Sequence, residues 1–127
     1  MKDIIIKTVP ASKIRNGGVG DYYETDNSIH ILVAEQTNPD YEVLIGFHEL
    51  IEFILTRKRG ISEQDIDTYD RFWELRNKQG LVNCPEPGED ASNTIYRTEH
   101  SIAIDLERIL CRELGYNFED YNKQLIN

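Results

Sequence analysis

Hydrophobic and polar residues alternate in the first third of the chain, which predicts β-strands. Residues 3–9 form a short β-rich run that ends at Pro10. Residues 21–25 and 28–34 predict the two arms of a hairpin joined at Asp26 and Asn27. In the second arm, Ile29, Ile31 and Val33 share one face of the strand, and His30 and its alternating neighbours share the other. The N-terminal part therefore predicts a hairpin or small sheet.

The remaining residues follow a helical period. Asn38-Pro39-Asp40 opens a helix that we expect to run to about Arg59, before Gly60. Ser62 caps a second helix to about Gln79, and a third spans about Ile95 to Leu114. The second helix presents one packing face, formed by Ile66, Tyr69, Phe72, Trp73 and Arg76. The aperiodic residues 81–94 predict a long loop, and residues 118–126 a short last helix. The pattern predicts one α+β domain over residues 1–127, with a small sheet against three long helices.

The first helix carries the motif H-E-x-x-E at His48, Glu49 and Glu52. His48 and Glu52 are four residues apart, so they share one helical face and could bind one metal ion. Glu49 occupies the position of the general base in the H-E-x-x-H zinc hydrolases. These residues and Thr56 form a narrow polar stripe, which also includes Ile45, on a helix that is otherwise apolar nearly all round. The stripe is either a site on a buried helix or the solvent face, and its spacing does not decide between them.

The third helix offers a further metal ligand, either Glu99 or His100. Glu99 falls near the middle of its apolar face, where a carboxylate needs a partner. His100 lies at the border of that face, on the side of Glu107. A set of His48, Glu52 and His100 has the composition of catalytic zinc sites and of the facial triad of non-haem iron(II) oxygenases. His30 is expected to be a half-buried strand residue rather than part of the site.

Composition limits the partners. The 127 residues carry 23 acidic and 14 basic side chains, a net charge of -9, which argues against binding to nucleic-acid backbones or anionic membranes but leaves DNA mimicry open. The chain has no apolar run long enough for a membrane span and no signal-peptide core, so we expect a cytoplasmic protein. Its two cysteines, Cys84 and Cys111, form no C-x-x-C pair and are expected to be reduced. The sequence does not indicate an oligomeric state.

These motifs resemble those of small zincin-like metallopeptidase proteins of phages and prophages. Residues 43–52 resemble the zincin active-site helix, and the hairpin at residues 21–34 precedes it as the zincin edge strand does. Residues 86–90, 96–100 and 107–116 are similar to segments of uncharacterised phage proteins that carry H-E-L-x-E. The resemblance implies a zincin-like fold and a zinc ion, with His48 as a ligand and Glu49 as the general base. Glu52 stands where zincins have their second histidine, and no zincin pattern assigns the third ligand.

Three functions are consistent with these features. The first is a zinc-dependent hydrolase of peptides or proteins. In it, Tyr96 stabilises an oxyanion, or His100 does so if it is not a metal ligand. The substrate adds as an extra strand to residues 28–34. The second is a non-catalytic acidic binding protein on the same scaffold. The third is a helical nucleotide pyrophosphohydrolase holding magnesium, with ligands Glu49, Glu52, Glu99 and Asp105; the two histidines argue against it.

Overall fold

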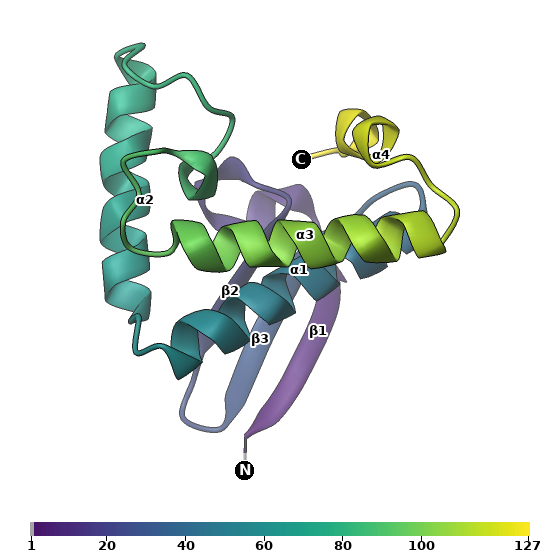
Figure 1. Ribbon diagram of the computed structural model, residues 1–127. Coiled ribbons are helices and arrows are strands. Elements are labelled where there is room, and N and C mark those ends of the chain that lie inside the picture. The colour runs from purple at the N-terminus through teal and green to yellow at the C-terminus, as the bar shows by residue number, and fades with distance from the viewer. Residues whose placement is uncertain (1) are drawn as a thin grey trace.

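The computed structural model describes residues 2–127 and has an α+β architecture (Figure 1). A small sheet comes first in the chain and helices follow. The strands are β1 (Asp3–Val9), β2 (Gly20–Glu24) and β3 (Ser28–Ala34). The long helices are α1 (Pro39–Lys58), α2 (Glu63–Lys78) and α3 (Arg97–Glu113), and α4 (Phe118–Gln124) is short. Three 3₁₀ turns complete the order: η1 (Ala11–Lys13), η2 (Arg15–Gly17) and η3 (Pro87–Glu89). The predicted class and the predicted elements are confirmed.

The sheet has the strand order β1-β3-β2. β2 and β3 form the predicted antiparallel hairpin, closed by a 2.8 Å hydrogen bond from the Thr25 N–H to the Ser28 carbonyl. β1 pairs with β3 in parallel, which places β3 in the centre. The prediction that a peptide adds to residues 28–34 is therefore wrong, because both edges of β3 are already paired. The free edges of the sheet belong to β1 and β2.

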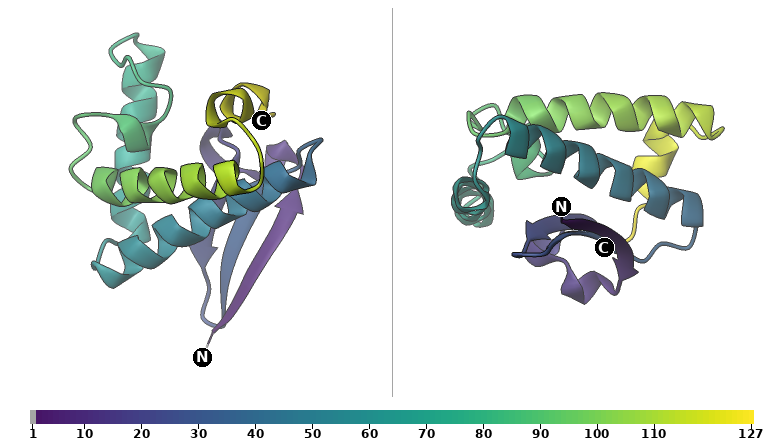
Figure 2. Two further views of the ribbon diagram at one scale, coloured as in Figure 1. Left: turned by 45° about the vertical axis from the view of Figure 1, so that its right-hand side comes forward. Right: turned by 90° about the horizontal axis from the view of Figure 1, so that it is seen from below.

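α1 lies between the sheet and α3, so the three form successive layers (Figure 2). α3 runs antiparallel to α1, and α2 stands beside the C-terminal end of α1 and the N-terminal end of α3 (Figure 1). Burial on both sides explains why α1 is apolar nearly all round. Its fully buried Leu44 belongs to a hydrophobic cluster with Tyr41, Cys111 and Tyr121, and its Phe53 belongs to one with Tyr22 and Ile31 of the sheet.

The orientation of α1 decides between the two interpretations of its polar stripe. The stripe faces inward: His48 is 9% exposed, Glu52 6% and Thr56 2%. Val43 and Ile54 of the apolar arc are instead 56% and 47% exposed. The stripe is thus not a solvent face, and its polar groups need partners inside the protein.

The helix ends follow the sequence signals. The side chains of Asn38, Ser62 and Asn117 accept hydrogen bonds from the backbone N–H groups of Asp40, Asp65 and Asp120. On α2, Ile66 and Trp73 are buried as predicted, but Phe72 is 51% exposed, because the helix packs only at the side of the layers. Among residues 2–127, no helix is long and apolar enough to cross a membrane.

Core packing makes a direct prediction about stability. Leu44→Ala should lower the free energy of unfolding by about 2–5 kcal/mol, because Leu44 is fully buried between α1 and α3. The neighbouring Val43→Ala removes an exposed apolar side chain and should cost well under about 1 kcal/mol. Urea unfolding of both variants in chelator measures the difference, and equal losses would contradict this orientation of α1.

Candidate metal centre

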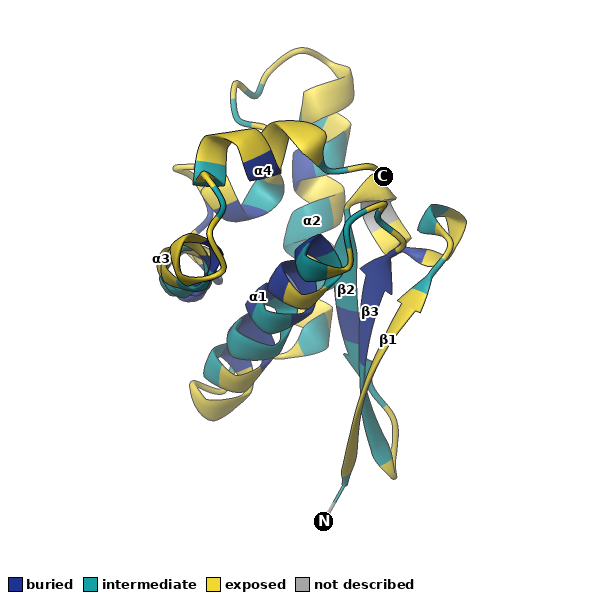
Figure 3. Ribbon diagram, turned by 90° about the vertical axis from the view of Figure 1, so that its right-hand side faces the viewer, coloured by how far each residue is buried: buried dark blue, intermediate teal, exposed yellow. Residues whose placement is uncertain are grey.

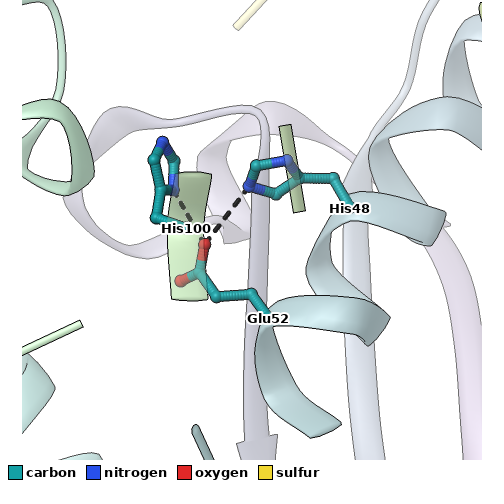
Figure 4. Close-up of side chains that lie close together, drawn as sticks. All are labelled: His48, Glu52 and His100. Carbon is teal, nitrogen blue, oxygen red and sulfur yellow. Dashed lines mark hydrogen bonds and ion pairs between the residues drawn. The ribbon is translucent and has the colours of Figure 1, made fainter. Parts of the chain in front are cut away.

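His48, Glu52 and His100 converge on one point between α1 and α3 (Figure 4). The Oε2 atom of Glu52 lies 3.2 Å from Nε2 of His48 and 2.8 Å from Nδ1 of His100. One donor atom from each residue lies within 4.8 Å of the other two, and all three residues are buried. Two imidazole nitrogens and a carboxylate oxygen are the donor set of a catalytic zinc site with one open position. The residues present therefore fit a divalent metal ion.

Glu107 orients the His48 ring. Its Oε1 atom lies 2.8 Å from Nδ1 of His48, and its Oε2 atom accepts a 2.5 Å hydrogen bond from the hydroxyl of Tyr121. An ionised carboxylate can only accept, so Nδ1 carries the proton in this pair. In the neutral ring this leaves the lone pair on Nε2, the nitrogen that faces Glu52. A carboxylate behind a histidine in this way fixes the tautomer and raises the basicity of a metal ligand.

The loop before α3 packs against the His100 ring. A Cβ atom added to Gly88 would lie 2.4 Å from Cγ of His100, so only glycine lets η3 approach this closely. Glu86 Oε1 lies 2.8 Å from the buried Nε2 of His100 and forms an ion pair with the protonated ring. The Glu86 side chain is half exposed at the mouth of the cleft. The residues around Gly88 thus hold the ring with Nδ1 toward Glu52.

Glu49 lies beside this cluster and does not belong to it. It is partly buried and lines the adjacent cleft, where its carboxylate packs on Gly20 of β2. A Cβ atom added to Gly20 would lie 2.7 Å from Oε1 of Glu49, so a larger residue at position 20 would displace this carboxylate. Burial raises the pKa of Glu49 to about 8; the Glu52 carboxylate adds to this rise, and His48 opposes it. A carboxylate with a pKa near neutrality, close to the ligands but separate from them, has the properties of a general base.

The residues of the cluster shift one another's pKa values. Burial opposes ionisation of Glu52, but hydrogen bonds from His100 and His48 lower its pKa to about 2. Burial likewise disfavours a charged His100, but the carboxylates of Glu52 and Glu86 raise its pKa to about 10. The pKa of His48 is raised well above its ordinary value, because Glu107 and Glu52 outweigh the effect of burial. In the metal-free protein, protonated imidazoles therefore occupy the place of a cation.

The other candidate residues lie elsewhere. Glu99 is buried, but its carboxylate binds Arg59 at 2.8 Å, so His100 rather than Glu99 completes the cluster. His30 stacks on Tyr23, with ring centroids 4.6 Å apart, on the face of the sheet away from α1. The Tyr96 hydroxyl donates a 2.5 Å hydrogen bond to Asp70 and is not free to bind an oxyanion.

Sequence reasoning missed four residues of the site. Tyr22 donates a 3.2 Å hydrogen bond to Oε1 of Glu52, and Glu107, Tyr121 and Glu86 support the two histidines. Glu107 follows His100 by two helical turns, so a search of the same helical face would have found it. No sequence signal identifies Tyr22, Tyr121 or Glu86, because their positions depend on the packing of β2, α4 and a loop.

The cluster opens into a cleft of about 570 Å³ between β2, α2 and the loop before α3. Besides Glu49 and the cluster, its walls carry five carboxylates and one arginine, Arg15. The five are Asp21, Glu63, Asp67, Asp70 and Glu86. The cleft is large enough for a few amino-acid residues of a substrate, and its charge favours a cationic or metal-bound ligand.

The pKa shifts of His100 and Glu52 predict how the stability of the metal-free protein depends on pH. The pKa of His100 is raised from 6.5 to about 10, so its contribution is complete below pH 6.5 and is lost as the pH rises through about 10. The pKa of Glu52 is lowered from 4.5 to about 2, so its contribution is complete above pH 4.5 and is lost on acidification. The contributions of His100 and Glu52 are thus both complete between about pH 4.5 and 6.5. Urea unfolding from pH 6.5 to 10 should show a decline that is weaker in His100→Gln, and an identical decline in this variant would contradict the network.

The hydrogen bond between Glu107 and His48 should strengthen metal binding. Glu107→Ala should weaken zinc binding about 10- to 100-fold, because the Nδ1 proton of His48 loses its acceptor. Glu99→Gln is the matched control, since this buried carboxylate on the same helix binds Arg59 and not the cluster. Competition with a chromogenic chelator measures both affinities. Equal weakening in the two variants would show that the effect comes from destabilised α3 rather than from His48.

Comparisons with known proteins add no assignment to this geometry. The chain matches no protein-family model, no curated protein and no solved structure. The interpretation of the site therefore depends on the residues described above.

Proposed function

We propose that this protein is a zinc-dependent hydrolase of the zincin-like metallopeptidase type. His48, Glu52 and His100 hold the metal, and Glu49 is the general base. One observation carries the proposal: the polar stripe of α1 is buried against His100, and the cluster opens into a cleft lined by Glu49. The motif resemblance to phage and prophage proteins points in the same direction.

The roles of the residues follow from their positions. A zinc ion, when bound, acts as a Lewis acid and lowers the pKa of water. Glu49 lines the cleft beside the cluster and would accept a proton from the attacking water and pass it to the leaving group. The Tyr22 hydroxyl donates a long hydrogen bond of 3.2 Å to Glu52 at the cluster, whereas the Tyr96 hydroxyl is held by a 2.5 Å bond to Asp70. Tyr22 is therefore better placed than Tyr96 to donate to an oxyanion.

The proposed substrate is an extended peptide that lies along β2. β2 is a free edge of the sheet and lines the cleft beside Glu49. The Tyr22 N–H donates a 2.8 Å hydrogen bond to the Asp21 side chain, and the Tyr22 carbonyl accepts a 3.1 Å hydrogen bond from Arg15. A bound peptide strand would replace these two side chains as the partner of the Tyr22 backbone.

The alternatives have less support. A magnesium site of Glu49, Glu52, Glu99 and Asp105 would need these carboxylates together, but Glu99 binds Arg59 and Asp105 is exposed. A non-catalytic binding protein would need its acidic groups on an open face. The carboxylates of Glu52 and Glu107 are buried against histidines instead, which is typical of a metal site.

The function is tested by separating metal binding from catalysis. Protein purified without chelator should contain zinc by elemental analysis, and zinc should raise the melting temperature of chelated protein. His48→Ala should abolish this rise, whereas Glu49→Gln should keep it and lose about 10²- to 10⁴-fold in cleavage rate.

A broad peptide library at pH 6 to 9 supplies the substrate. The absence of cleavage by zinc-loaded protein would exclude peptidase activity and leave the binding-protein alternative. A zinc response in His48→Ala equal to that of the unaltered protein would place the metal elsewhere.

A further inference from the structure

β1 is an exposed and apolar edge strand (Figure 3). Its sequence contains three consecutive isoleucines, of which Ile4 is 56% and Ile6 51% exposed. No strand of residues 2–127 lies on its outer side. Soluble proteins protect such edges, because a row of free backbone groups next to apolar side chains pairs readily with another strand.

The backbone of β1 has its free groups at alternate residues. The Asp3 N–H donates to the carbonyl of Asn27, and the Val9 carbonyl accepts from the N–H of Glu35, so the odd-numbered residues bond toward β3. In a parallel pair, the residues between them point their N–H and C=O groups the other way. Ile4, Ile6 and Thr8 therefore present donors and acceptors along the open edge.

The two faces of β1 differ in character. Ile6 faces α1, because a Cβ atom added to Gly46 of α1 would lie 3.3 Å from the Cγ2 atom of Ile6. Ile4 shares that face by alternation. Asp3, Ile5 and Lys7 lie on the opposite face, and Lys7 lines a shallow groove there with Tyr23 and Leu32. Neither Asp3 nor Lys7 forms an ion pair within residues 2–127, so each charge is available to a partner.

We propose that β1 pairs antiparallel with β1 of a second copy of this chain, which joins the two sheets across a two-fold axis. The occupant is a second copy because the strand is complementary to itself. With the axis at Ile5, Asp3 lies opposite the partner's Lys7, and Lys7 opposite the partner's Asp3. An isologous contact of this kind closes after two subunits.

The hydrogen-bond pattern agrees with this register. Ile4 lies opposite the partner's Ile6, and both have outward-facing backbone groups, so they exchange both hydrogen bonds. Ile5 lies opposite the partner's Ile5 in a pair without hydrogen bonds, where side chains approach most closely. A register centred on Ile6 also satisfies the backbone, but it places Asp3 opposite Val9 and leaves the charges unmatched. The charges therefore select the register centred on Ile5.

The dimer leaves the candidate metal centre free. β1 and β2 are opposite edges of the sheet, and the cleft lies along β2. The inference thus stands apart from the proposed function, and it is tested on chelated protein, where the metal plays no part.

Charge reversal tests the interface. Sedimentation equilibrium of chelated protein should give a dimer, and Asp3→Lys or Lys7→Asp alone should raise its dissociation constant at least 10-fold. The double variant D3K/K7D should restore the dimer, because the opposite charges face each other again. Leu75→Lys is the matched control, since Leu75 is 62% exposed on α2, and it should not change the dissociation constant. A monomer at 100 µM, or a double variant no better than the single ones, would overturn the proposal.

Cysteine crosslinking tests the register independently. In a Cys84→Ser background, Ile5→Cys should form an intermolecular disulfide on mild oxidation, because the two residues meet at the axis. Ile6→Cys is the control and should not crosslink, since residue 6 faces residue 4 of the partner. Crosslinking of Ile6→Cys in place of Ile5→Cys would overturn the register centred on Ile5.

Discussion

The burial of the polar stripe of α1 is the constraint on which the other features depend. His48 and Glu52 lie on a helix covered by the sheet on one side and by α3 on the other. Buried polar groups cost free energy unless they have partners, so the surrounding elements must supply them. α3 supplies His100 and Glu107, β2 supplies Tyr22, and α4 supplies Tyr121. β2, α3 and α4 thus each contribute at least one side chain to the same network.

Three carboxylates, those of Glu52, Glu86 and Glu107, face the two imidazoles of this network, which explains the direction of its pKa shifts. Glu52 and Glu107 both face His48, and Glu52 also faces His100. A buried ion pair is weak evidence for stability, because desolvation offsets the attraction between the charges. A divalent cation of the kind proposed above would replace the protons that these histidines carry and neutralise the same carboxylates. The proposed zinc ion would do so with the same donor atoms.

The two free edges of the sheet have different surroundings. The edge of β2 lies in the cleft, and the Arg15 and Asp21 side chains bond the backbone of Tyr22. The edge of β1 has no such cover, and three isoleucines occupy it between Asp3 and Lys7. The first surroundings suit a ligand that exchanges with side chains, and the second suit a lasting contact between subunits.

The sequence by itself determined the elements and their order. Alternation in residues 28–34, the caps Asn38 and Ser62, and the glycines after the helices are local signals, and the observed elements follow them closely. The spacing of His48 and Glu52 also places them on one face, because helical geometry alone requires it. Local signals do not contain the direction in which that face points.

Tertiary structure decided the rest of the site. From the sequence, the stripe of α1 could equally face solvent, and either Glu99 or His100 could complete the site. The packing of α3 places His100 against Glu52 and Glu99 against Arg59. The parallel pairing of β1 put β3 in the centre of the sheet, which moved the free edge beside the cleft to β2. Glu107, Tyr121 and Tyr22 joined the site through contacts between residues far apart in the chain. Such contacts depend on how whole elements pack together, and no short stretch of sequence encodes them.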